Sequence, residues 1–179
     1  MILEVTNALV DVIHDATPDL APWVEIRSLV QGDTAASDNK AAIALIAVEP
    51  HPYMINQPLV EGIAGLVRAP LHVKLTYLIT YFGDHDESQT RLGRIVQAFH
   101  TTPMLAGADL PQPLVGTVDA IAMRLLSPTH DERNQIWGVL GRPGRVALFY
   151  GVDVAPVPVL EREGAGRVRS HRVDYVAAS

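Results

Sequence analysis

The segment from residue 70 to residue 103 constrains the fold more than any other part of the chain, because its hydrophobic period changes once and abruptly. Its first part alternates between two sets of side chains, as the two faces of a β-strand do. One set is mixed in polarity and comprises His72, Lys74, Thr76, Leu78 and Thr80, and the other is apolar or aromatic and comprises Leu71, Val73, Leu75, Tyr77, Ile79 and Tyr81. The pattern predicts a strand with one strongly apolar face.

The second part of this segment has the period of an α-helix. After a short polar turn at residues 82–86, apolar side chains recur at i, i+3, i+4 and i+7, namely at Leu92, Ile95, Val96 and Phe99. Pro103 disfavours helical backbone at the residue before it, so the helix is expected to begin at Glu87 and to end near His100. We expect this strand, turn and helix to form the centre of the domain.

The remaining elements follow from the same two periods and from proline and glycine breaks. Helical spacing predicts an N-terminal helix, and apolar or alternating runs predict further strands, of which the one at 41–48 is expected to be central and covered on both faces. The expected elements are a helix at 2–16 and strands at 23–30, 41–48, 118–126 and 145–154, with a loop at 31–40, a break at 49–52, an irregular stretch at 53–69 and a loop at 106–113.

Thr129 is expected to start another helix, because Glu132 three residues later completes a capping box. The order of elements predicts an α+β (mixed α/β) fold, a single domain in which a mixed sheet of about five strands is flanked by about three helices. We assign residues 1–158 to this domain. Residues 159–179, where charged residues and glycine become frequent, are assigned to an extended C-terminal tail.

Composition excludes several classes of function. The chain of 179 residues has no cysteine, which excludes disulfides, thiolate metal sites and cysteine nucleophiles. Its net charge of −6 is spread along the chain, which disfavours binding to nucleic acid or anionic lipid. No basic leader opens the sequence, and no apolar run approaches the about 18 residues that span a bilayer. We therefore expect a soluble, cytoplasmic protein without nucleic-acid or membrane partners.

The strongest candidate for chemistry is the triplet Asp84, His85 and Asp86, because two carboxylates beside an imidazole can bind a divalent cation or polarise water. The same residue types are common between a strand and a helix, where they turn the chain and cap the helix. We favour the structural role and predict no catalytic residue, no metal site and no cofactor. A small metal-dependent hydrolase built on this triplet is the alternative.

Several motifs occur in an order that resembles one known family. They are PLHVKLTYLITYFG at 70–83, Leu92-Gly93, Ala98-Phe99-His100, Pro103-Met104-Leu105, Ala47-Val48-Glu49-Pro50, and Ile136-Trp137-Gly138-Val139-Leu140 before the strand at 146–154. Their order is similar to that of the cap, or tail-terminator, proteins of extracellular contractile injection systems, the phage-tail-like particles of the antifeeding-prophage and virulence-cassette type. The resemblance covers most of the chain and rests on packing motifs rather than on catalytic signatures.

This resemblance implies a phage tail-terminator-like fold and a structural subunit, not an enzyme. Such a subunit would form a ring, expected to be a hexamer, on the end of the inner tube, where it contacts the terminal sheath layer. It would be found in the cytoplasm as part of an assembled injection particle that can be released. A monomeric binding module is the second alternative.

Two segments are predicted to contact partners. The irregular stretch at 53–69 can reach the tube or a neighbouring subunit, and residues 167–177 regain apolar side chains and can dock as an added strand. The predicted partner-binding residues are Tyr53, Met54, Arg167, Val168, Arg169, Val173 and Tyr175.

Overall fold

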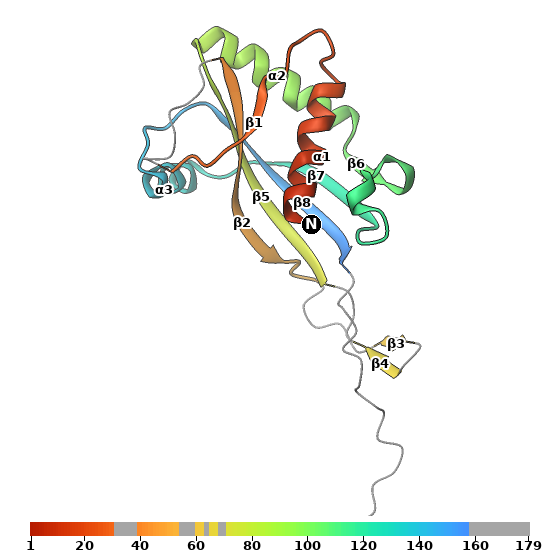
Figure 1. Ribbon diagram of the computed structural model, residues 1–179. Coiled ribbons are helices and arrows are strands. Elements are labelled where there is room, and N and C mark those ends of the chain that lie inside the picture. Colours follow the sequence, from red (N-terminus) through yellow and green to blue (C-terminus); the bar gives the residue numbers. More distant parts are fainter. Residues whose placement is uncertain (31–38, 54–59, 63–64, 68–70, 158–179) are drawn as a thin grey trace, which may run out of the picture.

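A mixed sheet of six strands forms the centre of the domain in the computed structural model, which describes residues 1–30, 39–53, 60–62, 65–67 and 71–157 (Figure 1). β1 pairs with β2 in parallel, and every other neighbouring pair in this sheet is antiparallel. From one edge to the other the strands are β1 (Val24–Ile26), β2 (Lys40–Pro50), β5 (Leu71–Phe82), β8 (Ala147–Val157), β7 (Ala120–Leu126) and β6 (Met104–Ala106).

The two faces of the sheet are covered by different helices. α1 (Ile2–Asp15) and α2 (His85–Thr101) pack on one face, while α3 (His130–Leu140) crosses the other (Figure 1). Strand β5 supplies both cores, because Leu75 and Tyr77 point toward α1 and α2 whereas Leu78 contributes to the core under α3. The alternation seen in the sequence therefore separates two hydrophobic layers. No helix in the described part of the chain is both long and apolar enough to cross a membrane.

The fold class predicted from the sequence is confirmed, since a mixed sheet flanked by three helices forms one domain. The N-terminal helix and the two faces of β5 lie where the periodicity places them. Helix α2 begins two residues earlier than expected, at His85, and ends one residue later than His100. The six-stranded sheet has one strand more than predicted. The additional strand is β6, which directly follows Pro103 and was not predicted.

Strand β2 differs most from its prediction. It is second from the edge rather than central, and it continues through Glu49 and Pro50, where a break was expected. Pro50 pairs with Val73 of β5, and β1 covers the other side of β2 only at residues 41–43. Because no described strand lies beyond Pro50, its missing N–H removes no bond from the sheet. The register with β5 shifts between Leu45 and Ala47, which is a β-bulge.

Smaller differences occur in the connections. The strand expected at 23–30 is only Val24–Ile26 long, and the loop expected at 106–113 contains two short 3-10 helices, η1 (Gly107–Asp109) and η2 (Gln112–Leu114). Within the irregular stretch expected at 53–69, β3 (Val60–Gly62) and β4 (Gly65–Val67) pair as a separate two-stranded sheet. The tail predicted at 159–179 lies outside the described residues.

Candidate interaction surface

Helix α3 is fixed on the sheet by strong signals at both of its ends. The backbone N–H of Glu132 donates to Thr129 Oγ1 at 3.3 Å, and the backbone N–H of Thr129 donates to Glu132 Oε2 at 2.7 Å, which confirms the predicted capping box. At the other end Gly141 has a φ of 66°, the left-handed conformation in which glycine commonly ends a helix. Trp137 anchors the helix between these caps, in the core that includes Phe149.

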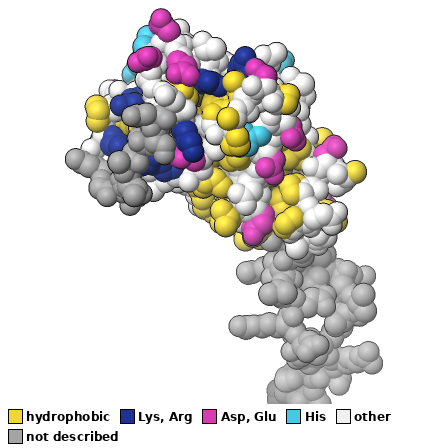
Figure 2. Space-filling view, turned by 45° about the horizontal axis from the view of Figure 1, so that its top comes forward, with side chains coloured by type: hydrophobic (Ala, Val, Ile, Leu, Met, Phe, Trp, Pro, Cys, Tyr) yellow, Lys and Arg dark blue, Asp and Glu magenta, His cyan; other side chains and the backbone are white. Residues whose placement is uncertain are grey.

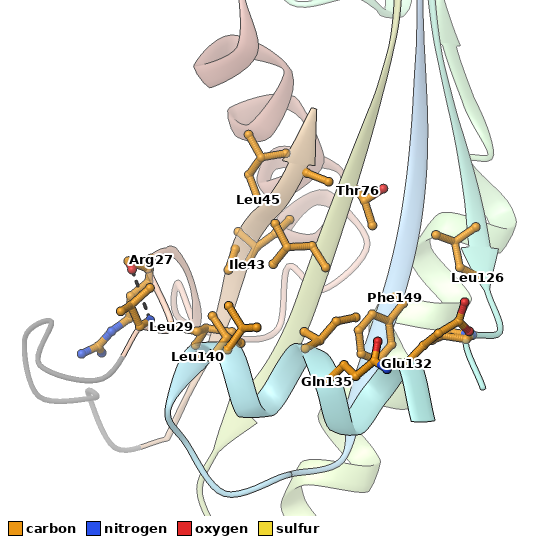
Figure 3. Close-up of a pocket in the computed structure, with 18 of the residues that line it drawn as sticks. Arg27, Leu29, Ile43, Leu45, Thr76, Leu126, Glu132, Gln135, Leu140 and Phe149 are labelled. Atoms are coloured by element: carbon orange, nitrogen blue, oxygen red, sulfur yellow. Dashed lines mark hydrogen bonds between the residues drawn. The ribbon is translucent and has the colours of Figure 1, made fainter. Parts of the chain in front are cut away.

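A groove of about 1070 Å³ lies where α3 meets the sheet (Figure 3). Its floor is formed by β2 and by the ends of β7 and β8, and its wall is the side of α3. Apolar side chains predominate along it, namely Leu29, Ile46, Leu126, Ile136, Val139, Leu140 and Phe149. Val139 is 87% exposed, so one apolar side chain of the wall stands almost entirely in solvent.

Opposite charges mark the two ends of the groove. At the β1 end, Arg27 Nη1 donates to Glu25 Oε1 at 3.0 Å, and its guanidinium lies 5.8 Å from the ring centroid of Phe82. At the β7 end stands Glu132, whose pKa is held below its usual range chiefly by the hydrogen bond from the backbone N–H of Thr129. The groove is therefore apolar along its length, with the guanidinium of Arg27 held at one end and the carboxylate of Glu132 held at the other.

The same face of the sheet is polar beyond the groove. Glu49 pairs with Lys74 at 3.9 Å, and Asp153 pairs with Arg124 at 3.8 Å, across neighbouring strands β2, β5, β8 and β7. His51 Nε2 lies 4.0 Å from Asp153 Oδ1. These ion pairs are partly exposed, so each contributes little to stability, but together they make this half of the face suited to a polar contact rather than to a core.

Of the predicted partner-binding residues, only Tyr53 lies in the described part of the chain. It is 88% exposed, and its ring centroid lies 5.9 Å from that of His51. The other six residues, Met54, Arg167, Val168, Arg169, Val173 and Tyr175, lie outside the described residues. Tyr53 is thus available to a partner, at the end of the chain segment that follows β2.

The triplet Asp84, His85 and Asp86 occupies the start of α2. Asp84 is the N-cap residue, although its side chain makes no capping hydrogen bond, and its backbone carbonyl instead accepts from Ser88 Oγ at 2.8 Å. His85 Nε2 lies 2.8 Å from Gln89 Nε2, and all three side chains of the triplet are exposed. Among the described residues no three His, Asp or Glu side chains gather as a metal site would require. The position of the triplet fits its structural role.

Sequence reasoning did not find the groove, because its lining comes from parts of the chain that are far apart in the sequence. Residues 26–30, strand β2, the end of β7 and helix α3 all contribute. One signal was present in the sequence. Val139 adds an apolar residue outside the Ile136, Trp137 and Leu140 stripe by which α3 packs, and such a residue has no place in that core.

The arrangement of sheet and helices is that of tube terminators from contractile injection particles. The chain aligns over its full length with the sheath/tube terminator of the PVC extracellular contractile injection system in its extended state, at 19% identity and a TM-score of 0.65. It aligns over 96% of its length with the tube-terminating cap of the anti-feeding prophage, at 20% identity and a TM-score of 0.58. The chain spans 64% and 60% of the lengths of these two proteins.

Sequence comparison assigns the family. The chain belongs to the Pvc16_N family, the Pvc16 N-terminal domain, whose profile matches residues 4–170. No curated protein sequence matches the chain significantly. The family resemblance found in the sequence motifs is thereby confirmed.

Proposed function

We propose that this chain is a structural cap subunit, a tail terminator, of a contractile injection particle. In this role it ends the inner tube and contacts the terminal layer of sheath, and it catalyses no reaction. The observation that carries the proposal is the alignment of the whole chain with a sheath/tube terminator, together with the family match over residues 4–170. A cap acts through surfaces rather than through a reactive site, and the domain offers an apolar groove and a polar sheet face for this purpose.

The finer features of the proposal are a closed ring, expected to contain six copies, and a location within an assembled particle that can be released. A tube end with rotational symmetry favours a cap of matching symmetry, and a ring closes only when each subunit presents two different complementary surfaces. Tyr53, Met54 and the residues of the 159–179 tail are proposed to contact tube, sheath or a neighbouring copy. The tail is proposed to lie outside the compact domain formed by residues 1–158.

The test uses the cells that encode the protein. Particles carrying an epitope-tagged copy are imaged by electron microscopy with a gold-labelled antibody, and tube lengths are measured with and without the gene. The proposal predicts label at one end of each particle and a broad distribution of tube lengths when the gene is deleted. Label spread along the sheath, or a deletion strain with normal particles of normal length, would show that the chain is not the cap.

A second measurement addresses the alternative of a monomeric binding module. Light scattering coupled to size-exclusion chromatography gives the mass of the purified chain, for which a monomer is 19.4 kDa. The same mass determination on protein released from purified particles shows whether the copies remain associated. Multiples of the monomer mass in either sample support the ring, whereas a monomer in both supports the binding module.

A further inference from the structure

The two edges of the six-stranded sheet carry different exposed surfaces. Strand β1 forms one edge and β6 forms the other, with four strands between them. The groove opens beside β1, with Val139 on its α3 wall. Met104 on β6 is 56% exposed, and it places an apolar side chain on the opposite edge. A contiguous apolar surface such as the groove, with Val139 almost fully exposed on its wall, is typical of a contact with a partner.

The corner beside β1 is basic. The guanidinium carbons of Arg27 and Arg145 lie 5.8 and 5.0 Å from the ring centroid of Phe82, which holds both cations together. Arg142 Nη2 donates to the backbone oxygen of Val30 at 3.4 Å. Glu25 bonds Arg27, whereas neither Arg142 nor Arg145 has a carboxylate partner among the described residues. Figure 2 shows many of the Lys and Arg side chains in view gathered on one side of the molecule.

The corner beside β6 is acidic. Asp15, at the end of α1, and Asp109, in η1 just after β6, line one shallow hollow together with Arg94. Arg94 Nη1 already donates to both carboxylate oxygens of Asp19, at 3.1 Å each. Asp15 and Asp109 are exposed, and within the described residues neither has a cationic partner. The hollow lies on the side of β6 that faces α1 and α2, where Leu105 points, whereas Met104 points to the opposite face of the sheet. The β6 edge therefore carries an exposed apolar side chain on one face and free carboxylates on the other.

We propose that the groove beside β1 receives the β6 edge of a second copy of this chain, with the Arg142 and Arg145 corner of one copy facing the Asp15 and Asp109 hollow of the next. The occupant is a second copy because the chain itself carries both complementary surfaces. One is an apolar groove with a basic corner, and the other is the β6 edge, with Met104 on one face and free carboxylates on the other. Complementary charge of this kind fixes orientation and excludes wrong partners.

The contact is heterologous, because the two surfaces lie on opposite edges of the sheet and differ in character. A heterologous contact between two copies leaves each with one unused contact surface, so further copies add head to tail until the assembly closes into a ring. The inference rests on the proposed function, since it names the surface by which the cap subunits would contact each other. It can nevertheless fail while the cap function stands.

Crosslinking provides a direct test, because the chain has no cysteine of its own. Val139→Cys places a thiol on the groove side and Met104→Cys places one on the β6 edge. We expect a short bis-maleimide to link a mixture of the two single variants into heterodimers, and to leave each variant alone monomeric. A chain carrying both substitutions should give a ladder of covalent multimers that ends at the size of the ring.

Charge reversal supplies the matched control. With Val139→Cys and Met104→Cys copies mixed, Arg145→Glu on the first copy should lower heterodimer yield about two- to fivefold, the range of an exposed ion pair. Adding Asp109→Arg to the second copy should restore the yield. The same Arg145→Glu change placed on the Met104→Cys copy lies outside the linked contact, and it should leave the yield unchanged.

The crosslinking is done on the purified chain and again on assembled particles, where a ring that closes only on a tube end would be present. Efficient linking of either single variant to itself would mean an isologous contact and would overturn the inference. So would the absence of a heterodimer in both settings. Gold label at one particle end without these crosslinks would retain the cap function and reject this contact surface. Crosslinks in a chain that does not associate with particles would retain the contact surface and reject the cap function.

Discussion

The hydroxyl of Tyr77 on β5 lies 2.9 Å from Thr6 Oγ1 on α1, and this is a buried polar contact between the N-terminal helix and the central strand. Thr6 Oγ1 also donates to the backbone oxygen of Ile2 at 3.0 Å. A threonine hydroxyl has one proton, so Tyr77 is the donor in the contact between the two side chains. The bond fixes the position of α1 along the sheet, in a core that is largely apolar.

The first prediction is that removing the two partners of this hydrogen bond lowers the free energy of unfolding by unequal amounts. Tyr77→Phe should lower the free energy of unfolding by about 1 kcal/mol, because Thr6 keeps its bond to Ile2. Thr6→Val should cost more, up to about 3 kcal/mol, because it leaves the buried Tyr77 hydroxyl without an acceptor. The double variant should be more stable than the sum of the two losses implies. Urea unfolding of all four proteins measures this, and strict additivity would contradict the hydrogen bond.

The second prediction concerns alkaline pH. Burial raises the pKa of Tyr150 from its usual 10.0 to about 12, so the folded protein keeps this proton where the unfolded chain has lost it. Stability from this group is therefore complete below pH 10 and falls as the pH rises toward 12. Tyr150→Phe should be nearly neutral at pH 7 and should make the alkaline loss of stability less steep. Urea midpoints between pH 8 and pH 12 test the prediction, and identical slopes for both proteins would contradict it.

The third prediction concerns the start of α3. Thr129→Ala should lower the free energy of unfolding by about 1 kcal/mol, as loss of a helix N-cap does. Glu132→Gln should be less stable than the natural protein at neutral pH, because the depressed pKa of Glu132 marks a stabilising contact of the ionised carboxylate. That difference should be present above the usual pKa of 4.5 and should disappear as the pH falls through the lower pKa of the folded state.

Asp131→Asn is the matched control for this pair. It removes the same charge from the same helical turn, but Asp131 takes no part in the capping box. The helix dipole affects both carboxylates, so only the difference between Glu132→Gln and Asp131→Asn reports on the cap. Fluorescence-detected urea unfolding is suitable, because Trp137 lies in α3 itself. Equal losses of stability from the two substitutions would show that Glu132 contributes no more than another carboxylate in the same helical turn.

The elements that sequence predicted well are those whose signal is local. The alternation along β5 and the capping box at Thr129 each depend on residues close together in the chain, and the structure has both as expected. The missed strand β6 has only three residues, too few for any period to be visible. The extension of β2 through Pro50 was missed because proline is unfavourable in a strand unless its missing N–H faces an open edge, which is a property of the sheet.

The groove was beyond sequence reasoning for a related reason. Leu29, Leu126 and Val139 are far apart in the chain, and only the crossing of α3 over the sheet brings them together. Leu29 and Leu126 are ordinary residue types for a buried core, so neither signals a surface, and Val139, which lies outside the packing stripe of α3, does not locate a groove by itself. The triplet Asp84, His85 and Asp86 is a local pattern that suggested chemistry where the described part of the chain has none of the required clustering. It lies at the start of α2, and all three of its side chains are exposed.

The last prediction concerns the C-terminal tail, which is assigned from its sequence. Residues 163–179 contain four of the predicted partner contacts beyond Arg167, namely Val168, Arg169, Val173 and Tyr175. Every strand and helix described here ends by Val157, so deleting residues 163–179 should leave the domain folded, with an unchanged urea midpoint. The deletion should abolish attachment to the sheath or closure of the ring, as scored by gold label on particles. A quadruple substitution of Val168, Arg169, Val173 and Tyr175 by alanine is the matched full-length control and should have the same effect, whereas normally capped particles from either variant would assign the partner contacts to the folded domain instead.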